Sequence, residues 1–280
     1  MFLRDHSVGI IGLGQMGGSM AAAIKQFDPA IVITGCDLDE SLCRQARERG
    51  LIDVIAVNEE DVIDQTEVVI IALPALQIGD VLRMHRETLR EKLLVTDTGS
   101  LKRQIMATAK TCEISNFVGG HPLAGTELRG EKSWNADLFR EARYFTTENS
   151  STQDAAKQLM AELIGNVGAE AIAIDPGAHD KLFAVSSNLP HLFAYILRAQ
   201  FEQAAGNNGQ LDLFACPSYR GATRVAGSDS EMVFQMLWGN RDYLGKSLSE
   251  LRVSLNRAQK ALDSGDEKEF RRIFGAKQAG

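Results

Sequence analysis

The first half of the chain alternates between short apolar runs and longer segments in which apolar residues recur every three or four positions. The apolar runs predict strands at 7–11, 31–36, 68–73, 93–97, 116–119 and 170–174, the first of them buried, and the segments between them predict helices. Strands that alternate with helices in this way form parallel sheets with helices on both faces. We therefore expect a Rossmann-type doubly wound α/β sheet, with its ligand crevice at the carboxyl ends of the strands.

The pattern changes at Asp175. After this residue, apolar residues recur almost only with the spacing of an α-helix. Asp175 is suited to cap a helix, and Pro176 to occupy its first position. A long helix is expected from about residue 179 to 205, with a kink at Pro190, because proline lacks the backbone N–H that an α-helix needs. Further helices are expected at about 230–237 and 243–262.

Two domains are expected from this change of pattern: an α/β domain over residues 1–174 and an all-helical domain over residues 175–280. The chain ends soon after the last expected helix, so we expect no separate regulatory domain behind it.

Three glycines, Gly12, Gly14 and Gly17, stand between the first expected strand and a helix. In the GxGxxG pattern the first permits a tight turn, the second lets backbone approach a pyrophosphate, and the third allows close helix packing. This spacing also occurs in ordinary turns. However, the second strand ends at Asp37, twenty residues after Gly17, where a carboxylate can accept hydrogen bonds from ribose hydroxyls. The combination predicts a dinucleotide site at the start of the first helix.

Asp37 also bears on the choice of dinucleotide. A carboxylate repels the 2′-phosphate of NADP, which is usually met by an arginine near this point. The first basic residue after Asp37 is Arg44, so NAD is expected rather than NADP. The expected cofactor contacts come from the glycine loop and the strand ends: Gly12, Leu13, Gly14, Gln15, Met16, Gly17, Asp37, Leu73, Pro74 and Thr98.

Composition narrows the class of protein. The 30 basic and 37 acidic residues give a net charge of −7, which argues against a nucleic-acid surface. No apolar stretch is long enough to span a membrane, and the first residues lack the core of a signal peptide. The four cysteines show no metal-ligand spacing and are expected to be reduced thiols. We expect a cytoplasmic protein with no metal, nucleic-acid or membrane partner.

Four further motifs carry candidate chemistry. Asp97-Thr-Gly-Ser-Leu-Lys102 and His121-Pro-Leu-Ala-Gly-Thr-Glu127 follow expected strands, whereas Ser187-Asn-Leu-Pro-His191 and Ala222-Thr-Arg-Val-Ala226 lie in the helical half. Together with the glycine motif, and in this order, they resemble the prephenate and arogenate dehydrogenases of tyrosine biosynthesis.

The resemblance implies an oxidative decarboxylation that yields 4-hydroxyphenylpyruvate from prephenate. Hydride passes from C4 of prephenate to NAD, CO2 leaves from C1, and the ring becomes aromatic. The resemblance also implies a homodimer built on the helical domain. Arogenate differs from prephenate by an ammonium in place of a keto group, and residues 220–224 offer no acid to pair with it. Prephenate is therefore the expected substrate, and the alternative is an arogenate dehydrogenase or a cyclohexadienyl dehydrogenase that accepts both substrates.

The roles of residues in the α/β half follow from the same resemblance. His121 matches the catalytic histidine, whose neutral ring can accept a hydrogen bond from the C4 hydroxyl. Ser100 matches the serine that orients this histidine and the nicotinamide; capping a helix that starts at Leu101 is its alternative role. Thr126 and Glu127 match positions of the substrate site, although Glu127 is equally compatible with a solvated loop carboxylate.

Two arginines of the helical half match substrate-binding positions. Arg224 matches an arginine that grips a substrate carboxylate, a task that suits the bidentate and permanently charged guanidinium group. Arg220 stands where some relatives have a lysine that reaches into the neighbouring subunit's site.

Three more residues of the helical half match the substrate site. His191 matches the second histidine of the family's Ser-His-Leu-Pro-His motif, and Asn188 replaces the first. Asn can donate and accept hydrogen bonds but carries no charge. His179 also matches a family position. On an unkinked helix His179 and His191 would lie about 120° apart, so both would face the site only if the kink at Pro190 permits it.

Two other functions remain open at this point. A β-hydroxy-acid dehydrogenase would share the glycine-rich start and the helical second half, but it would use a lysine in the helical domain, and Lys181 lacks a supporting motif. A regulator that senses NAD would keep the fold without the chemistry, although His121 and Ser100 are both retained.

Overall fold

The computed structural model describes residues 2–126, 128–205 and 211–275. The chain forms two compact units, Met1–Asp180 with Gly227–Gly239, and Lys181–Ala226 with Asn240–Gly280. The first unit thus runs past residue 174 and takes in a segment from the helical half. The domain boundary at 174 stays a prediction.

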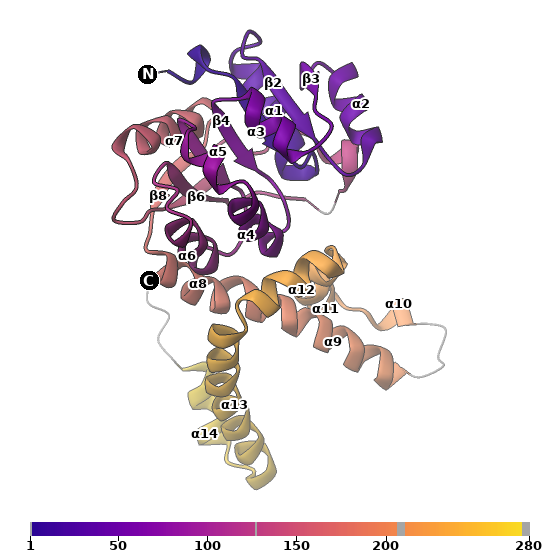
Figure 1. Cartoon of the computed structure of the whole chain (residues 1–280). Helices are drawn as coiled ribbons and strands as arrows, with labels where there is room; N and C mark the ends of the chain where they lie inside the picture. Colours follow the sequence, from indigo (N-terminus) through magenta and orange to yellow (C-terminus); the bar gives the residue numbers. More distant parts are fainter. Residues whose placement is uncertain (1, 127, 206–210, 276–280) are drawn as a thin grey trace. The chain divides into compact units, whose positions relative to one another are not determined.

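The first unit is built on a sheet (Figure 1). Its strands are β1 (Val8–Ile11), β2 (Ile33–Cys36), β3 (Val54–Ile55), β4 (Val68–Ile71), β5 (Leu94–Asp97), β6 (Phe117–Pro122), β7 (Arg143–Thr147) and β8 (Glu170–Ala173). They lie in the order β3-β2-β1-β4-β5-β6-β7-β8. All neighbouring pairs from β3 to β6 are parallel, which confirms the expected doubly wound sheet. The strand order reverses between β1 and β4, where such sheets bind ligands.

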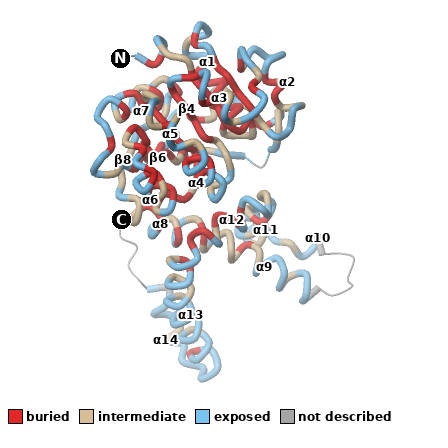
Figure 2. Tube along the Cα trace, in the orientation of Figure 1, coloured by how far each residue is buried: buried red, intermediate tan, exposed pale blue. Residues whose placement is uncertain are grey.

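Helices cover both faces of this sheet. They are α1 (Gln15–Phe27), α2 (Glu40–Glu48), α3 (Glu59–Gln65), α4 (Ala75–Met84), α5 (Arg86–Arg90), α6 (Arg103–Thr111) and α7 (Asp154–Asn166). The unit also contains the first part of α8 (Pro176–Phe183), and α12 (Ser230–Gly239), which packs against α4. Short 3₁₀ turns occur at Leu3–Asp5 and Gly130–Ser133. Central strands such as β1 and β4 are buried along their whole length (Figure 2). This explains why their sequences read as continuous apolar runs rather than as alternating patterns.

The core of the first unit has two parts. Apolar residues of α1 and α7 pack together with Val8 and Ile10 of β1. Residues of α4 and α6 pack with Ile11 and with β4 residues such as Val69. Successive residues of a strand therefore enter different clusters, as the alternation of side chains across a sheet requires.

Strand β7 was not expected from the sequence, and it departs from the parallel pattern. It pairs antiparallel with β6 and parallel with β8. Its sequence, Arg143-Tyr-Phe-Thr-Thr147, mixes an exposed charge with the fully buried Tyr144 and gives no continuous apolar run. The short elements β3 and α3 were also missed.

All the elements found among the described residues of the second unit are helical, as expected. It contains α9 (Leu189–Ala205), α10 (Leu211–Phe214), α11 (Pro217–Thr223), α13 (Arg241–Ser264) and α14 (Glu267–Phe274), with a 3₁₀ turn whose bounds are Arg224–Gly227. Among the described residues, we find no helix whose length and hydropathy would suit a bilayer-spanning segment.

The single long helix expected at 179–205 is divided. Asp175 caps α8 as expected, and its Oδ1 accepts from the Ala178 N–H at 2.8 Å. However, α8 ends at Phe183, and a π-helical turn follows over Ala184–Asn188 before α9 begins. The distortion therefore lies on the N-terminal side of Pro190. Proline has no N–H to donate to a carbonyl of the preceding turn, so the α-helical hydrogen bonds are interrupted there.

Candidate active site

The three glycines of the loop between β1 and α1 occupy three different environments. Gly12 has a φ of +91°, in the region that favours glycine. An added Cβ on Gly17 would overlap the Gly12 carbonyl oxygen, whereas a Cβ on Gly14 would meet nothing within 4 Å. The first glycine thus makes the turn and the third permits close packing. The second leaves open space at the N-terminus of α1, as a bound pyrophosphate requires.

The glycine loop is held by side chains from two other segments. Asp37, directly after β2, accepts from the Leu13 N–H at 2.7 Å and from the Asp39 N–H at 2.9 Å. The Trp134 indole donates to the Leu13 carbonyl at 2.8 Å. This role of Trp134 could not be predicted, since Trp134 lies far from the glycine motif along the chain. The first turn of α1 has no side-chain cap, so its N-terminus can serve an anion.

The remaining expected cofactor residues follow the neighbouring strands. Leu73 and Pro74 come directly after β4, and Pro74 occupies the N-cap position of α4. Thr98 follows β5, and its N–H donates to the Ile71 carbonyl at 3.2 Å. Met16 packs its side chain against the core beneath α1. Because β4 and β5 run parallel to β1, these residues share one edge of the sheet with the glycine loop.

Gln15 and Thr126, expected to contact cofactor and substrate respectively, are paired with each other. The Gln15 amide donates to the Thr126 hydroxyl at 2.7 Å, and its oxygen accepts from the Thr126 N–H at 3.0 Å. This pair ties the start of α1 to the loop after β6. Glu127 lies outside the described residues.

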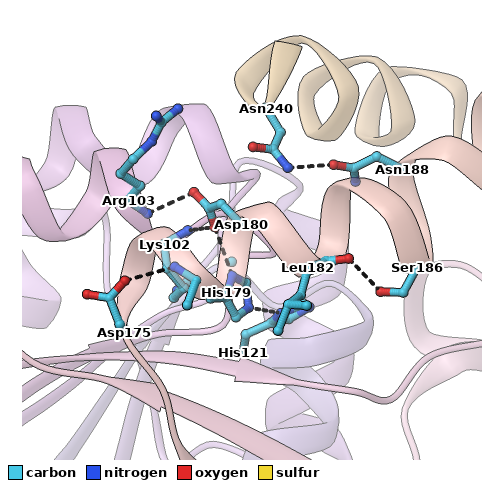
Figure 3. Close-up of polar contacts among 12 residues, drawn as sticks. Lys102, Arg103, His121, Asp175, His179, Asp180, Leu182, Ser186, Asn188 and Asn240 are labelled. Atoms are coloured by element: carbon cyan, nitrogen blue, oxygen red, sulfur yellow. Dashed lines mark hydrogen bonds and ion pairs between the residues drawn. The ribbon is translucent and has the colours of Figure 1, made fainter. Parts of the chain in front are cut away.

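His121 lies near the end of β6 and is in contact with a second histidine (Figure 3). Its Nδ1 is 2.9 Å from Nε2 of His179, and His179 Nδ1 is 2.8 Å from Oδ1 of Asp180. His179 and Asp180 come from α8 and are buried. Shielding from water, His179 and the Lys102 ammonium together lower the pKa of His121 well below its usual range. The His121 ring is therefore neutral at pH 7, which is the state that can accept a hydrogen bond.

A buried ion pair supports the strand that carries His121. Lys102 Nζ pairs with Asp97 and also donates to the Gly120 carbonyl at 2.5 Å. Asp97 in turn accepts from the Gly120 N–H at 3.0 Å. Burial raises the pKa of Asp97 and lowers that of Lys102, and the attraction between the two opposes both shifts. The motif at 97–102 was noted in the sequence, but its spacing did not reveal that both charges are buried.

Ser100 does not cap the following helix, so its alternative role is wrong. Helix α6 begins at Arg103 rather than Leu101. Its cap comes from Asp180, whose carboxylate accepts from the Lys102 N–H at 2.8 Å and the Arg103 N–H at 2.9 Å. Ser100 lies in the loop between β5 and α6 and is partly exposed.

The other expected substrate residues belong to the second unit, whereas Ser100, His121 and His179 belong to the first. Asn188 is buried and accepts from the Asn240 amide at 2.7 Å. His191 Nδ1 donates to the Ser187 carbonyl at 2.9 Å. Arg220 donates to the Ala215 carbonyl at 3.0 Å. Arg224, at the start of the 3₁₀ turn, is exposed.

Comparison with known proteins identifies two adjoining family matches. Residues 20–173 match the model of the prephenate dehydrogenase nucleotide-binding domain. Residues 175–276 match that of the prephenate dehydrogenase dimerization domain.

Similar proteins agree with these matches. The prephenate dehydrogenase of Bacillus subtilis (strain 168) is 29% identical over 268 residues, which cover 95% of this chain and 72% of that protein. The cyclohexadienyl dehydrogenase of Zymomonas mobilis is 28% identical, over 92% of this chain and 89% of that protein. Prephenate dehydrogenase from A. aeolicus, in complex with hydroxyphenyl propionate and NAD+, superposes with a TM-score of 0.88 at 25% identity, covering 96% of this chain and 94% of that one. With a nucleotide-binding loop, a neutral histidine at a strand end and both family domains in order, this chain belongs to the prephenate dehydrogenase family.

Proposed function

We propose that this protein is an NAD-dependent prephenate dehydrogenase that converts prephenate to 4-hydroxyphenylpyruvate and CO2. The observation that carries the proposal is the position of His121 at the end of β6, in the same unit as the glycine loop, where burial lowers the pKa of its ring. A dehydrogenation of this kind needs a hydrogen-bond acceptor for the reacting hydroxyl beside a bound dinucleotide.

The residues at the edge of the sheet fit NAD. The open side of Gly14 and the uncapped N-terminus of α1 suit the pyrophosphate, and the Asp37 carboxylate suits the ribose hydroxyls. Bound NAD supplies the nicotinamide that takes up a hydride. Leu73, Pro74 and Thr98 follow β4 and β5 along the same edge and would line its path.

His121 would act on the C4 hydroxyl of prephenate. As the C4–H bond releases its hydride, the C4 oxygen becomes more acidic, and His121 accepts its hydrogen bond. The electrons of the bond between C1 and its carboxylate pass into the ring as CO2 leaves. The phenol oxygen keeps its proton in the product, so atoms and charges balance. Ser100 would orient His121 and the nicotinamide.

Residues of the second unit would hold the substrate. Arg224 would pair with a carboxylate of prephenate, because guanidinium binds carboxylates in a bidentate manner. His191 and Asn188 would contact the region of the ring carboxylate, and Arg220 would contribute near the neighbouring subunit. Thr126 and Glu127 are also proposed to contact the substrate. We further propose a cytoplasmic homodimer as the working form.

The test is NADH formation from prephenate by the purified protein. His121→Asn should lower kcat by roughly 10²-fold or more, because it removes general acid–base help, and should leave NAD affinity unchanged. His85→Asn, which changes a histidine beside Glu59 instead, should have little effect.

Three results would contradict the proposal. A His121→Asn variant within about threefold of the wild type would remove His121 from the chemistry. Oxidation of 3-hydroxy acids without turnover of prephenate would indicate a β-hydroxy-acid dehydrogenase. NAD binding with no turnover of either substrate class would indicate a regulator.

A further inference from the structure

We propose that Asp180 and His179 act as positioning residues that set the tautomer of His121, so that Nδ1 carries the proton and Nε2 is the acceptor. The catalytic use of that acceptor rests on the proposed function. The tautomer itself depends only on contacts within the first unit.

The chain of contacts starts at Asp180. Its Oδ1 accepts from the Lys102 N–H and lies 2.8 Å from His179 Nδ1, and its Oδ2 accepts from the Arg103 N–H. A carboxylate offers acceptors only, and the N-terminus of α6 favours a negative charge at this place. His179 Nδ1 must therefore be the donor in its contact with Asp180 (Figure 3).

The contact between His179 and His121 then determines which nitrogen of His121 carries the proton. When His179 is neutral, its proton on Nδ1 leaves a lone pair on Nε2, and this atom lies 2.9 Å from His121 Nδ1. Two lone pairs cannot face each other at that distance, so His121 Nδ1 must donate. A neutral His121 then has its lone pair on Nε2.

This arrangement gives His179 a role different from the substrate contact expected from the sequence. Its side chain is fully buried, and its two ring nitrogens face Asp180 and His121. The Phe145 ring contacts it edge-on, with 5.9 Å between ring centroids. We therefore place His179 behind His121. The logic is that of an aspartate that holds a catalytic histidine in one tautomer, with a second imidazole inserted between the two.

These contacts from Asp180 through His179 would also stabilise the positive charge that develops on His121. When the ring draws the hydroxyl proton toward Nε2, the Nδ1–H bond to His179 strengthens. The Asp180 carboxylate, one ring further away, then favours the positive charge. Burial of the ring, any positive charge on His179 and the Lys102 ammonium act in the opposite direction, since each lowers the pKa of His121.

The tautomer can be measured without any substrate. The protein has five histidines, so ¹⁵N NMR of histidine-labelled protein gives few ring signals, and the spectrum of His121→Asn assigns those of His121. We expect neutral His121 to show a protonated Nδ1 and an unprotonated Nε2. His191, whose Nδ1 donates to Ser187, serves as an internal example of the same tautomer. A His121 ring protonated on Nε2 in the wild-type protein overturns the proposal.

Two variants of His179 separate positioning from simple packing. In His179→Gln, the amide oxygen can still accept from His121 while the amide nitrogen donates to Asp180. His179→Leu fills the same buried space without either group. We expect kcat to fall by roughly 10-fold or more in the leucine variant and to stay within about threefold in the glutamine variant, with KM for prephenate little changed in both.

Each result has a defined meaning. Equal activity of the two variants, or an effect on KM alone, would overturn the positioning role. If the leucine variant does not fold, the wild-type spectrum and the glutamine variant still decide the matter. A wild-type protein that shows the expected tautomer but does not oxidise prephenate would contradict the proposed function and leave the tautomer assignment standing.

Discussion

At the scale of single residues, Asp37 has two tasks at the end of β2. It accepts from the Leu13 and Asp39 N–H groups and so helps to shape the glycine loop. A carboxylate has about four lone-pair sites, so it can still accept from ribose hydroxyls. The same negative charge would repel a 2′-phosphate.

Replacing Asp37 should therefore change the choice of cofactor. The double variant Asp37→Ser with Leu38→Arg should shift the ratio of kcat/KM for NAD and NADP by at least about 10-fold toward NADP, because repulsion is removed and a cation is added. Leu38 is fully exposed, so Leu38→Arg alone is a control that should fold normally and shift the ratio less. If the wild-type protein already prefers NADP, our interpretation of Asp37 is wrong.

The preference between prephenate and arogenate is also set by individual side chains. Arogenate carries an ammonium that should find an acidic partner in a closed site. The segment Arg220–Arg224 has no acid, and the nearby Asp229 already pairs with Arg129 at 2.9 Å. We expect kcat/KM at saturating NAD to be about 10-fold or more higher for prephenate, since an unpaired buried charge is costly. A preference for arogenate would point to Glu127, Asn188 or an acid of the partner subunit.

At the scale of elements, the turn from β1 into α1 separates two uses of glycine. Gly17 allows the helix to pass close to the Gly12 carbonyl, whereas Gly14 leaves space that a cofactor would fill. The first use serves the fold, and the second serves binding.

Two alanine variants should distinguish these uses. Gly17→Ala should lower the free energy of unfolding by roughly 1–3 kcal/mol, because the new methyl group meets backbone that cannot move aside easily. Gly14→Ala should cost about 1 kcal/mol or less and should weaken NAD binding at least about 10-fold. Thermal unfolding and NAD titration measure both effects. Equal loss of stability in the two variants would contradict this division.

At the scale of the whole molecule, the second unit presents apolar side chains that its own helices leave uncovered. Ile196 and Leu197 of α9 and Leu213 and Phe214 of α10 are exposed. The segment that contains them matches a dimerization domain. A cluster of exposed apolar side chains on a protein surface often marks a site of association with another protein.

We therefore expect light scattering at micromolar concentration to give about twice the chain mass of 30.6 kDa. Leu213→Asp combined with Phe214→Asp should shift the population toward monomer, because charges would be buried in the interface. Val57→Asp, at a residue of the first unit that is 90% exposed, is the matched control and should leave the mass unchanged. A monomeric wild-type protein would count directly against the dimer.

Features that depend on neighbours along the chain could be predicted without the folded structure. Continuous apolar runs predicted most strands of the parallel sheet, because strands buried on both faces need apolar residues at every position. The glycine spacing predicted the turn at Gly12, and Asp175 predicted the start of α8. The linear order of the motifs also sufficed to indicate the family that the domain matches confirm.

Which distant groups meet depends on how the whole chain folds. Asp180 caps a helix whose first amides lie 77 and 78 residues away along the chain, and no local pattern could show this. The contact between His121 and His179, 58 residues apart, likewise arises because α8 returns to the end of β6. Apolar periodicity reports which face of an element is buried, but not which polar groups will be paired there. The helix cap and the orientation of the histidine pair are therefore properties of the folded chain.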